Sequence, residues 1–351
     1  MNTNKFSSEL LRWNKYVNTR QMPWKGEKDA YKVWLSEIIL QQTRVEQGLG
    51  YYQRFVKAFP TIASLATADE KKVFKLWEGL GYYSRCRNLM AAAKYIHTER
   101  NGVFPDIYEE ILALKGVGPY TAAAIASFAF NLPYAVLDGN VFRVLARVFG
   151  IKDPIDSTAG KKKFSQLASE LISTSQPADY NQAIMDFGAT ICKPLAPLCK
   201  ECIFRADCQA LKNNQIATLP FKEKKIKRRK RKFYFFNCTW RQKTVLEERT
   251  GKDIWRHLYQ FPLIESDTAD VDSIVEAAKE KKWILPQDTV GAISKVYRQA
   301  LTHQDIEAVF ISIQLRSVPK GLKDFEWVET VQVSHYSFPK LIRDYLADKP
   351  L

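Results

Sequence analysis

Four of the six cysteines in this chain of 351 residues lie within one short segment. They are Cys192, Cys199, Cys202 and Cys208, with the spacing C-x6-C-x2-C-x5-C. In a reducing compartment, such a cluster favours metal binding or catalysis over disulfide formation. Structural zinc sites usually contain two separated C-x2-C pairs or histidine partners, and no histidine lies between 192 and 208. The compact loop therefore suits zinc or an iron–sulfur cluster, and the spacing alone leaves both open.

The charge of the chain favours a polyanionic partner. The net charge is +15, and the segment 222–232 alone contains nine basic residues and one acidic residue. A run of this kind is by itself more typical of a solvated linker than of specific binding. About seven excess positive charges remain outside the run, so nucleic acid stays open as a partner.

No segment has the pattern of a signal peptide or of a membrane-spanning helix. The N-terminus contains no apolar core of a signal peptide, and the longest apolar stretch, 122–136, is too short to cross a bilayer. We therefore expect a soluble, intracellular and cytoplasmic protein, associated with the nucleoid. We also expect a monomer.

The distribution of apolar residues predicts two domains. Apolar residues recur at helical spacing through 30–215, for example at Trp34, Leu35 and Ile38. After the basic run, β-branched and aromatic residues dominate, and the apolar residues of 311–315 alternate with polar ones. The sequence therefore predicts an all-α domain over 1–216, a linker over 217–232 and an α+β domain over 233–351.

The segment 114–130, LKGVGPYTAAAIASFAF, has the features of a turn between two helices. We expect one helix to end at Gly116 and another to begin at Pro119, because proline is favoured at the first helical position. Gly116 and Gly118 allow positive φ and expose backbone N–H groups, which can bind phosphate at a helix N-terminus. An ordinary turn with a glycine cap is an equal alternative for G-V-G alone. The following Pro-Tyr-Thr and Ala-rich helix favour a helix-hairpin-helix, about 108–130, that grips a DNA backbone.

Two carboxylates are candidates for catalysis. Glutamate on a helix is usually a solvated surface residue, but Glu37 lies among apolar neighbours that would raise its pKa and suit a general acid. Gln41 and Gln42 follow it, and their amides can replace the hydrogen bonds of a base. Asp138 precedes an apolar helix, and the bare pattern favours a plain helix N-cap. One acid and one carboxylate together are the groups that cleave a glycosidic bond.

Taken together, these motifs resemble one family. The sequences WLSEIILQQT, LKGVGPYTA and LDGNV, followed by the four cysteines, are similar to those of MutY-type adenine DNA glycosylases over 20–210. That family is the mismatch-specific branch of the endonuclease III superfamily. The resemblance implies a [4Fe–4S] cluster on Cys192, Cys199, Cys202 and Cys208, without a role for iron in the hydrolysis. It also implies that Lys193, Lys200 and Arg205 face DNA.

The resemblance further implies a substrate and residue roles. The substrate is adenine mispaired with 8-oxoguanine or guanine in double-stranded DNA, flipped from the stack during base excision repair. Glu37 would protonate the adenine and later activate water, and Asp138 would stabilise the sugar cation. The remaining implied site residues are Tyr120 and Asn140 beside the chemistry, Arg20, Trp24, Lys25 and Gln182 around the adenine, and Gln42 and Tyr82 beside the 8-oxoguanine.

Tyr120 separates this chain from a related activity. Endonuclease III carries a lysine at this position, and a lysine amine can form a Schiff base and cut the strand, whereas a phenol cannot. We therefore expect a monofunctional glycosylase. The alternatives are a bifunctional pyrimidine-damage glycosylase with lyase activity, and a non-catalytic protein that binds damaged DNA. A pure binder would have no reason to keep both Glu37 and Asp138.

The last third of the chain resembles the C-terminal, Nudix-like domain of the same family. That domain checks for 8-oxoguanine, and we find no catalytic Nudix motif, so we expect no nucleotide hydrolysis. The Phe-Ser-His loop of the family corresponds to Leu301, Thr302 and His303. His257 stands where relatives usually have glycine. The resemblance implies that Thr302 and His303 contact the 8-oxoguanine.

Overall fold

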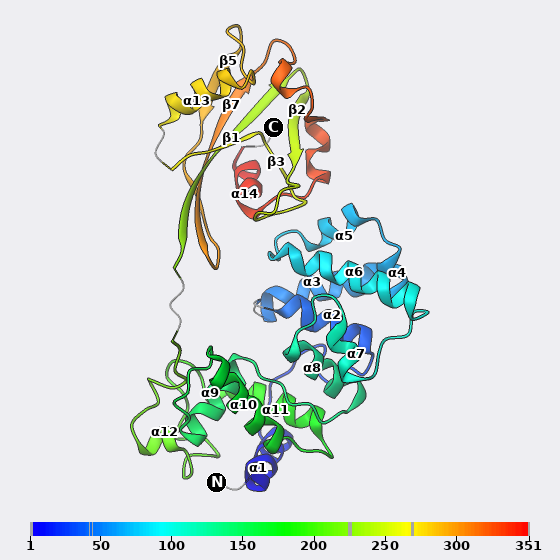
Figure 1. The fold of residues 1–351 in the computed structure, drawn as a ribbon, viewed down its shortest axis with the longest axis vertical. Coiled ribbons are helices and arrows are strands. Elements are labelled where there is room, and N and C mark those ends of the chain that lie inside the picture. Colours follow the sequence, from blue (N-terminus) through cyan, green and yellow to red (C-terminus); the bar gives the residue numbers. More distant parts are fainter. Residues whose placement is uncertain (1–2, 42, 44, 224–226, 268–269, 350–351) are drawn as a thin grey trace. The chain divides into compact units, whose positions relative to one another are not determined.

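A computed structural model describes residues 3–41, 43, 45–223, 227–267 and 270–349 (Figure 1). The chain divides into two compact units, one formed by 1–67 with 88–225 and the other by 68–87 with 226–351. Within the described ranges, no helix combines the length and the apolar character that crossing a bilayer requires.

The first unit is helical. It contains α1 (Thr3–Tyr16), α2 (Ala30–Leu40), α3 (Val45–Ala58), α4 (Ile62–Ala66), most of α6 (Tyr83–Glu99), α7 (Tyr108–Ala113), α8 (Pro119–Phe130), α9 (Gly139–Phe149), α10 (Thr158–Leu171), α11 (Pro177–Thr190) and α12 (Gln209–Lys212).

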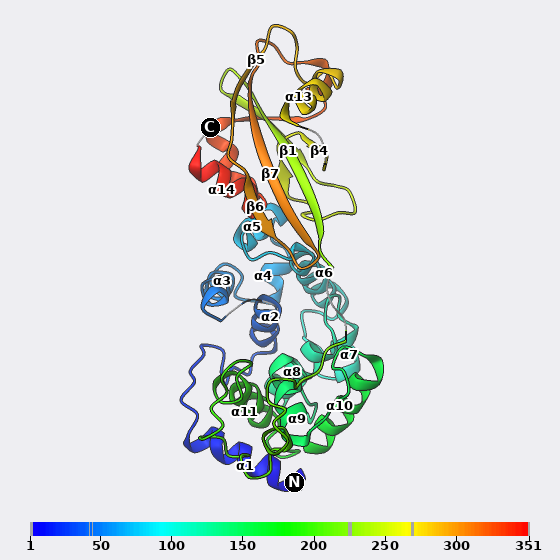
Figure 2. The same ribbon diagram turned by 90° about the vertical axis from the view of Figure 1, so that its left-hand side faces the viewer.

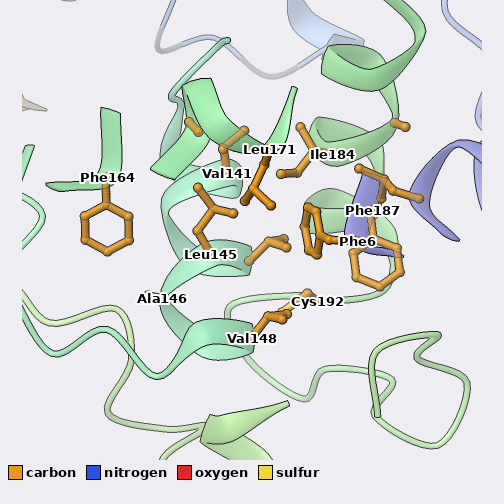
Figure 3. Packing of buried hydrophobic residues seen from close by; sticks show 14 of the residues in the cluster. Phe6, Val141, Leu145, Ala146, Val148, Phe164, Leu171, Ile184, Phe187 and Cys192 are labelled. Atoms are coloured by element: carbon orange, nitrogen blue, oxygen red, sulfur yellow. The ribbon is translucent and has the colours of Figure 1, made fainter. Parts of the chain in front are cut away.

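A contiguous apolar core holds α9, α10 and α11 together (Figure 3). The buried face of α9 carries Val141, Val144, Leu145 and Val148, the spacing that one side of a helix requires. Each such side chain stabilises the fold by about 1.5–3 kcal/mol when it is removed from water. Cys192 belongs to the same core. The core thereby connects the helix that begins after Asp138 to the cysteine loop.

The second unit is an α+β structure around one mixed sheet. Its elements are α5 (Glu70–Trp77), β1 (Arg229–Trp240), β2 (Lys243–Glu248), β3 (Tyr259–Gln260), β4 (Leu263–Glu265), α13 (Val271–Glu280), β5 (Thr289–Ile293), β6 (Tyr297–Ala300), β7 (Gln304–Gln314), η1 (Lys320–Leu322), β8 (Glu326–Glu329), η2 (Thr330–His335) and α14 (Lys340–Asp348). The sheet order is β3-β2-β1-β7-β5, with β4 on β1, β6 on β7 and β8 on β2.

Helices cover both faces of this sheet (Figures 1 and 2). Phe236 and Cys238 of β1 pack with Ile274 of α13, whereas Phe310 of β7 stacks on Tyr345 of α14, with ring centroids 3.9 Å apart. Successive side chains of a strand point to opposite faces. The long apolar strands therefore bury both of their faces.

Two boundaries differ from the sequence prediction. The strand β1 begins at Arg229, so four residues of the segment assigned to the linker pair with β7, with Arg229 opposite Gln304. The helix α7 ends at Ala113 and not at Gly116, because its C-cap, Leu114, already has extended backbone. The turn of the hairpin therefore covers 114–118.

Candidate active site

A pocket of about 800 Å³ opens in the helical unit. Residues of α2, α8 and α11, the first turn of α9, and the segment 20–28 line it. Most of the predicted catalytic and adenine-binding residues meet here: Arg20, Trp24, Lys25, Glu37, Gln41, Tyr120, Asp138, Asn140 and Gln182. Gln42, also predicted, lies outside the described residues.

Glu37 has the environment that a general acid needs. It lies on α2 between apolar residues and is only 9% exposed. Burial raises the pKa of Glu37 from 4.5 to about 7, a hydrogen bond with Tyr120 opposes this rise, and the nearby charge of Asp138 adds to it. A large fraction of Glu37 is therefore protonated at neutral pH.

Asp138 is both the N-cap of α9 and a member of the pocket. Its Oδ1 accepts a hydrogen bond from the backbone N–H of Val141 at 2.8 Å, and its Oδ2 accepts one from Nδ2 of Asn140 at 2.7 Å. Burial raises the pKa of Asp138, and these hydrogen bonds to its charged form oppose the rise. The capping hydrogen bonds therefore stabilise the charged form of Asp138, beside a glutamate whose pKa is raised.

Tyr120 contributes a phenol that is difficult to ionise. Burial raises its pKa well above 10, and the nearby charges of Glu37 and Asp138 add to this effect. Its hydroxyl also lies 3.6 Å from Sδ of Met185. The group therefore remains a neutral hydrogen-bond donor in the pocket.

Arg143 connects the pocket to the cysteine loop and was missed in the sequence. Its Nη2 donates to Oδ1 of Asn140 at 2.9 Å and to the carbonyl of Gly188 at 2.7 Å, and its Nε donates to the carbonyl of Cys192 at 2.7 Å. The signal was present as two arginines four residues apart, Arg143 and Arg147, between the apolar residues of helix α9. A buried arginine needs several acceptors.

Arg147 supports the cysteine loop itself. It is 2% exposed, and its guanidinium donates to the carbonyls of Lys193 and Leu219 at 2.7 and 3.0 Å. Its Nη1 also lies 3.5 Å from Sγ of Cys192. Arg147 thereby fixes the backbone that follows Cys192 against α9.

The four predicted metal ligands, Cys192, Cys199, Cys202 and Cys208, are near enough for their charges to interact. Burial raises the pKa of Cys202 to about 12, and the charges of Cys192, Cys208 and Cys199 add to the rise. All four are free thiols. Among the residues that the structure describes, no three Cys, His, Asp or Glu side chains are grouped tightly enough to bind a single metal ion. Four thiols without other donor types are the donor set of a structural zinc site as well as of a [4Fe–4S] cluster.

The hairpin turn contains one glycine that its backbone requires. Gly116 has φ +84°, and a Cβ at this position would lie 2.6 Å from Cβ of Asn88. Gly118 is the N-cap of α8, with φ −101° and no neighbour that a Cβ would meet. Of the two glycines, only Gly116 adopts the positive φ that glycine allows, whereas Gly118 has extended backbone, which suits any residue. The first N–H groups of α8 remain available to an anion.

Three predicted residues belong to the second unit. Tyr82 and Thr302 lie together, with their hydroxyl oxygens 2.7 Å apart. Tyr82 has φ +48°, a left-handed conformation that is rare for a bulky residue. Residues in such conformations cluster at functional sites. The side chain of His303 is exposed, while its carbonyl accepts from the N–H of Arg229 at 2.9 Å.

Comparison with known proteins places the chain in a family. The adenine DNA glycosylase of Buchnera aphidicola subsp. Baizongia pistaciae is 37% identical over 263 residues, which cover 75% of this chain and 74% of that protein. The chain belongs to the adenine DNA glycosylase family. The adenine DNA glycosylase of Mus musculus is 40% identical over 227 residues, covering 61% of this chain and 44% of that protein.

Two family models match the chain, and solved structures share the fold of part of it. The HhH-GPD superfamily of base excision DNA repair proteins matches residues 35–173, and the NUDIX domain matches 234–348. The structure of a thermostable thymine-DNA glycosylase aligns with 60% of this chain, and the alignment covers 97% of the thymine-DNA glycosylase. The two are 27% identical, and the TM-score is 0.56. An endonuclease III in a DNA complex shares the fold, with 17% identity and a TM-score of 0.51. The predicted fold class, a helical domain before an α+β Nudix-like domain, is confirmed.

Proposed function

We propose that this adenine DNA glycosylase removes adenine mispaired with 8-oxoguanine or guanine, with Glu37 as the acid and Asp138 as the stabilising carboxylate. The observation that carries the proposal is the pKa of Glu37, raised to about 7 beside Tyr120 and Asp138 in one pocket. Hydrolysis of an N-glycosidic bond needs a proton donor for the leaving base and a negative charge near the developing sugar cation.

The roles of these groups follow from their protonation. The adenine, flipped from the duplex into the pocket, accepts the proton of Glu37 as its bond to the sugar breaks. Asp138, whose charged form is hydrogen-bonded by Asn140 and the N–H of Val141, stabilises the oxocarbenium-like sugar. Glu37, now a carboxylate, takes a proton from the water that attacks the sugar, which restores the acid. Tyr120 donates to Glu37 without titrating itself.

We further propose that Cys192, Cys199, Cys202 and Cys208 hold a [4Fe–4S] cluster. The hydrogen bonds of Arg143 and Arg147 to the carbonyls of Cys192 and Lys193 hold the first residues of this loop against α9. The cluster would order the loop 192–208, so that Lys193, Lys200 and Arg205 can contact the DNA backbone. Together with the hairpin turn at Gly116, these contacts give affinity without reading sequence.

The second unit supports recognition of the base opposite the adenine. Tyr82 and Thr302 come from distant parts of the chain and share a hydrogen bond, so one base can contact both. We propose that Tyr82, Thr302 and His303 read 8-oxoguanine. The unit formed by 68–87 and 226–351 would thereby recognise the opposite base, whereas the unit formed by 1–67 and 88–225 would perform the chemistry.

The test uses three labelled duplexes that differ only in one pair: A:8-oxoguanine, A:G and A:T. With the full-length protein in excess, we expect strand scission after alkali treatment for the first two duplexes and none for A:T. Intact strands before alkali would agree with Tyr120 in place of a Schiff-base lysine. An absence of alkali-dependent scission at A:8-oxoguanine, or equal scission at A:T, would overturn the proposal.

A further inference from the structure

Asp186 is a fully buried carboxylate beside the candidate active site, on α11. Its two oxygens accept four hydrogen bonds. Oδ1 accepts from Nη1 of Arg20 at 2.9 Å and from Nε2 of Gln182 at 3.0 Å, whereas Oδ2 accepts from Nδ2 of Asn18 at 2.8 Å and from Nζ of Lys25 at 3.3 Å.

Three of these four donors line the pocket: Arg20, Lys25 and Gln182. Arg20 and Lys25 belong to an irregular segment between α1 and α2, whereas Gln182 belongs to α11. Long cationic side chains on an irregular segment adopt many rotamers, and fixing them costs conformational entropy. Asp186 fixes them before any base arrives, and the two cations offset the desolvation of its charge.

The carboxylate also determines the orientation of the Gln182 amide. An ionised carboxylate only accepts hydrogen bonds, so the amide must present its nitrogen to Asp186. Its Oε1 is then the group with which Gln182 can meet a base in the pocket. An acceptor suits the N6 amino group of adenine, and it opposes the O6 carbonyl of guanine.

We propose that Asp186 is a positioning residue that determines how strongly, and how selectively, the pocket holds a flipped adenine. It contacts no substrate and acts through Arg20, Lys25 and Gln182. The inference rests on the proposed function of the pocket. Loss of Asp186 should therefore weaken binding only when the duplex carries the adenine base. A residue that only supports the fold would affect binding with and without the base.

The test compares two duplexes with 8-oxoguanine opposite different nucleotides. One carries 2′-fluoro-2′-deoxyadenosine, which resists cleavage and keeps the base, and the other carries a tetrahydrofuran abasic analogue, which has no base. Asp186→Asn keeps the shape of the side chain but turns a nitrogen toward one pair of donors. We expect full-length D186N to bind the adenine-containing duplex about tenfold more weakly or worse, with less than about twofold change on the abasic duplex.

Two further variants keep the inference falsifiable. Asp106→Asn makes the same charge change at an exposed aspartate before α7 and should alter neither affinity. Asn18→Ala removes one donor to Asp186 from a residue that does not line the pocket, so it should give a smaller loss with the same dependence on the base. If D186N does not fold, the affinities of N18A for the two duplexes test the inference.

Equal losses on both duplexes, or no loss on either for D186N and N18A, would overturn the inference. Failure of the proposed function has a different signature. In that case the unaltered protein would not release adenine from A:8-oxoguanine, whatever the affinities of the variants.

Discussion

At the scale of single residues, burial raises the pKa of a glutamate to near neutral pH. The pKa of Glu37 is about 7 because its charged form is desolvated on α2, and the charge of Asp138 adds to the shift. The hydrogen bond from Tyr120 keeps the value from rising further. Catalysis by such an acid is most efficient when its pKa lies near the working pH.

Glu37→Gln should therefore reduce adenine release in single-turnover assays by about 10²–10⁴-fold, since an amide cannot transfer a proton. Affinity for the mismatch should change little. The rate of the unaltered protein should fall as the pH rises above about 7, where Glu37 loses its proton. A rate that stays constant from about pH 6 to about pH 9, or near-normal release by E37Q, would contradict the assignment.

The same pKa has a consequence for stability. The unfolded chain releases the Glu37 proton near pH 4.5 and the folded chain near pH 7. Between these values the folded state binds more protons, so this group lowers the free energy of unfolding as the pH rises. Relative to E37Q, the unaltered protein should lose up to about 3 kcal/mol between pH ~4.5 and pH ~8, measured by urea unfolding. A pH-independent difference would count against the raised pKa.

His257 stands at a position where the resemblance to the family implies glycine. Its φ is +66°, the region that glycine adopts without strain, which agrees with that expectation. Nδ1 of His257 lies 2.7 Å from Oε1 of Glu248, a contact that offsets part of the backbone strain. The substitution therefore has a local structural compensation.

At the scale of elements, the turn between α7 and α8 is held in one conformation by close packing. Gly116→Ala would add a Cβ 2.6 Å from Asn88 at φ +84°, a change that costs about 1–3 kcal/mol. We expect a Tm lower by several degrees and weaker binding to any duplex. Gly118→Ala, at φ −101° with open space around it, should leave the Tm nearly unchanged. Equal Tm values for the two variants would refute this explanation of the turn.

The cysteine loop is the second element whose content can be measured directly. Purified protein should contain about four irons per chain, since one [4Fe–4S] cluster uses four thiolates. Cys202→Ala should lose most of this iron and destabilise the loop. Cys238→Ala, a buried cysteine of β1 in the second unit, should keep the iron. Stoichiometric zinc without iron in anaerobically prepared protein would show that the cluster assignment is wrong.

At the scale of the whole molecule, the two units do not follow the order of the chain. Residues 68–87 group with the C-terminal unit, where Nζ of Lys75 donates to the carbonyl of Tyr336 at 3.0 Å and Glu78 accepts from the N–H of Phe338 at 2.9 Å. Tyr82 thereby belongs to the same unit as Thr302. The proposed recognition of the opposite base thus draws on two separate parts of the sequence.

His303→Ala should weaken binding to A:8-oxoguanine by one to two decades, because a hydrogen bond to a buried or charged partner is worth roughly 1–3 kcal/mol. Binding to A:G should change little. His335→Ala, at an exposed histidine of η2 in the same unit, serves as the matched control and should change neither affinity. Equal losses of H303A on both duplexes would mean that His303 only supports the fold.

Local patterns in the sequence were sufficient for the fold class and for most of the pocket. The apolar spacing of α9, the alternation within β7 and the acidic residue inside the apolar α2 all depend on side chains a few residues apart. The same holds for the cysteine spacing and for Pro119 at the start of α8. Such features follow from the periods of helices and strands, which any single segment displays.

Only the tertiary structure decided which distant groups meet. The strands β1 and β7 pair in parallel, with Arg229 opposite Gln304, and Asp186 binds Asn18 across 168 residues of chain. Arg143 joins the pocket to the cysteine loop in the same way. A buried charge or a long strand needs hydrogen-bond partners, but the neighbouring sequence does not show which residues these partners are. The partners depend on how the apolar faces pack, because packing determines which polar groups are buried together and must satisfy one another.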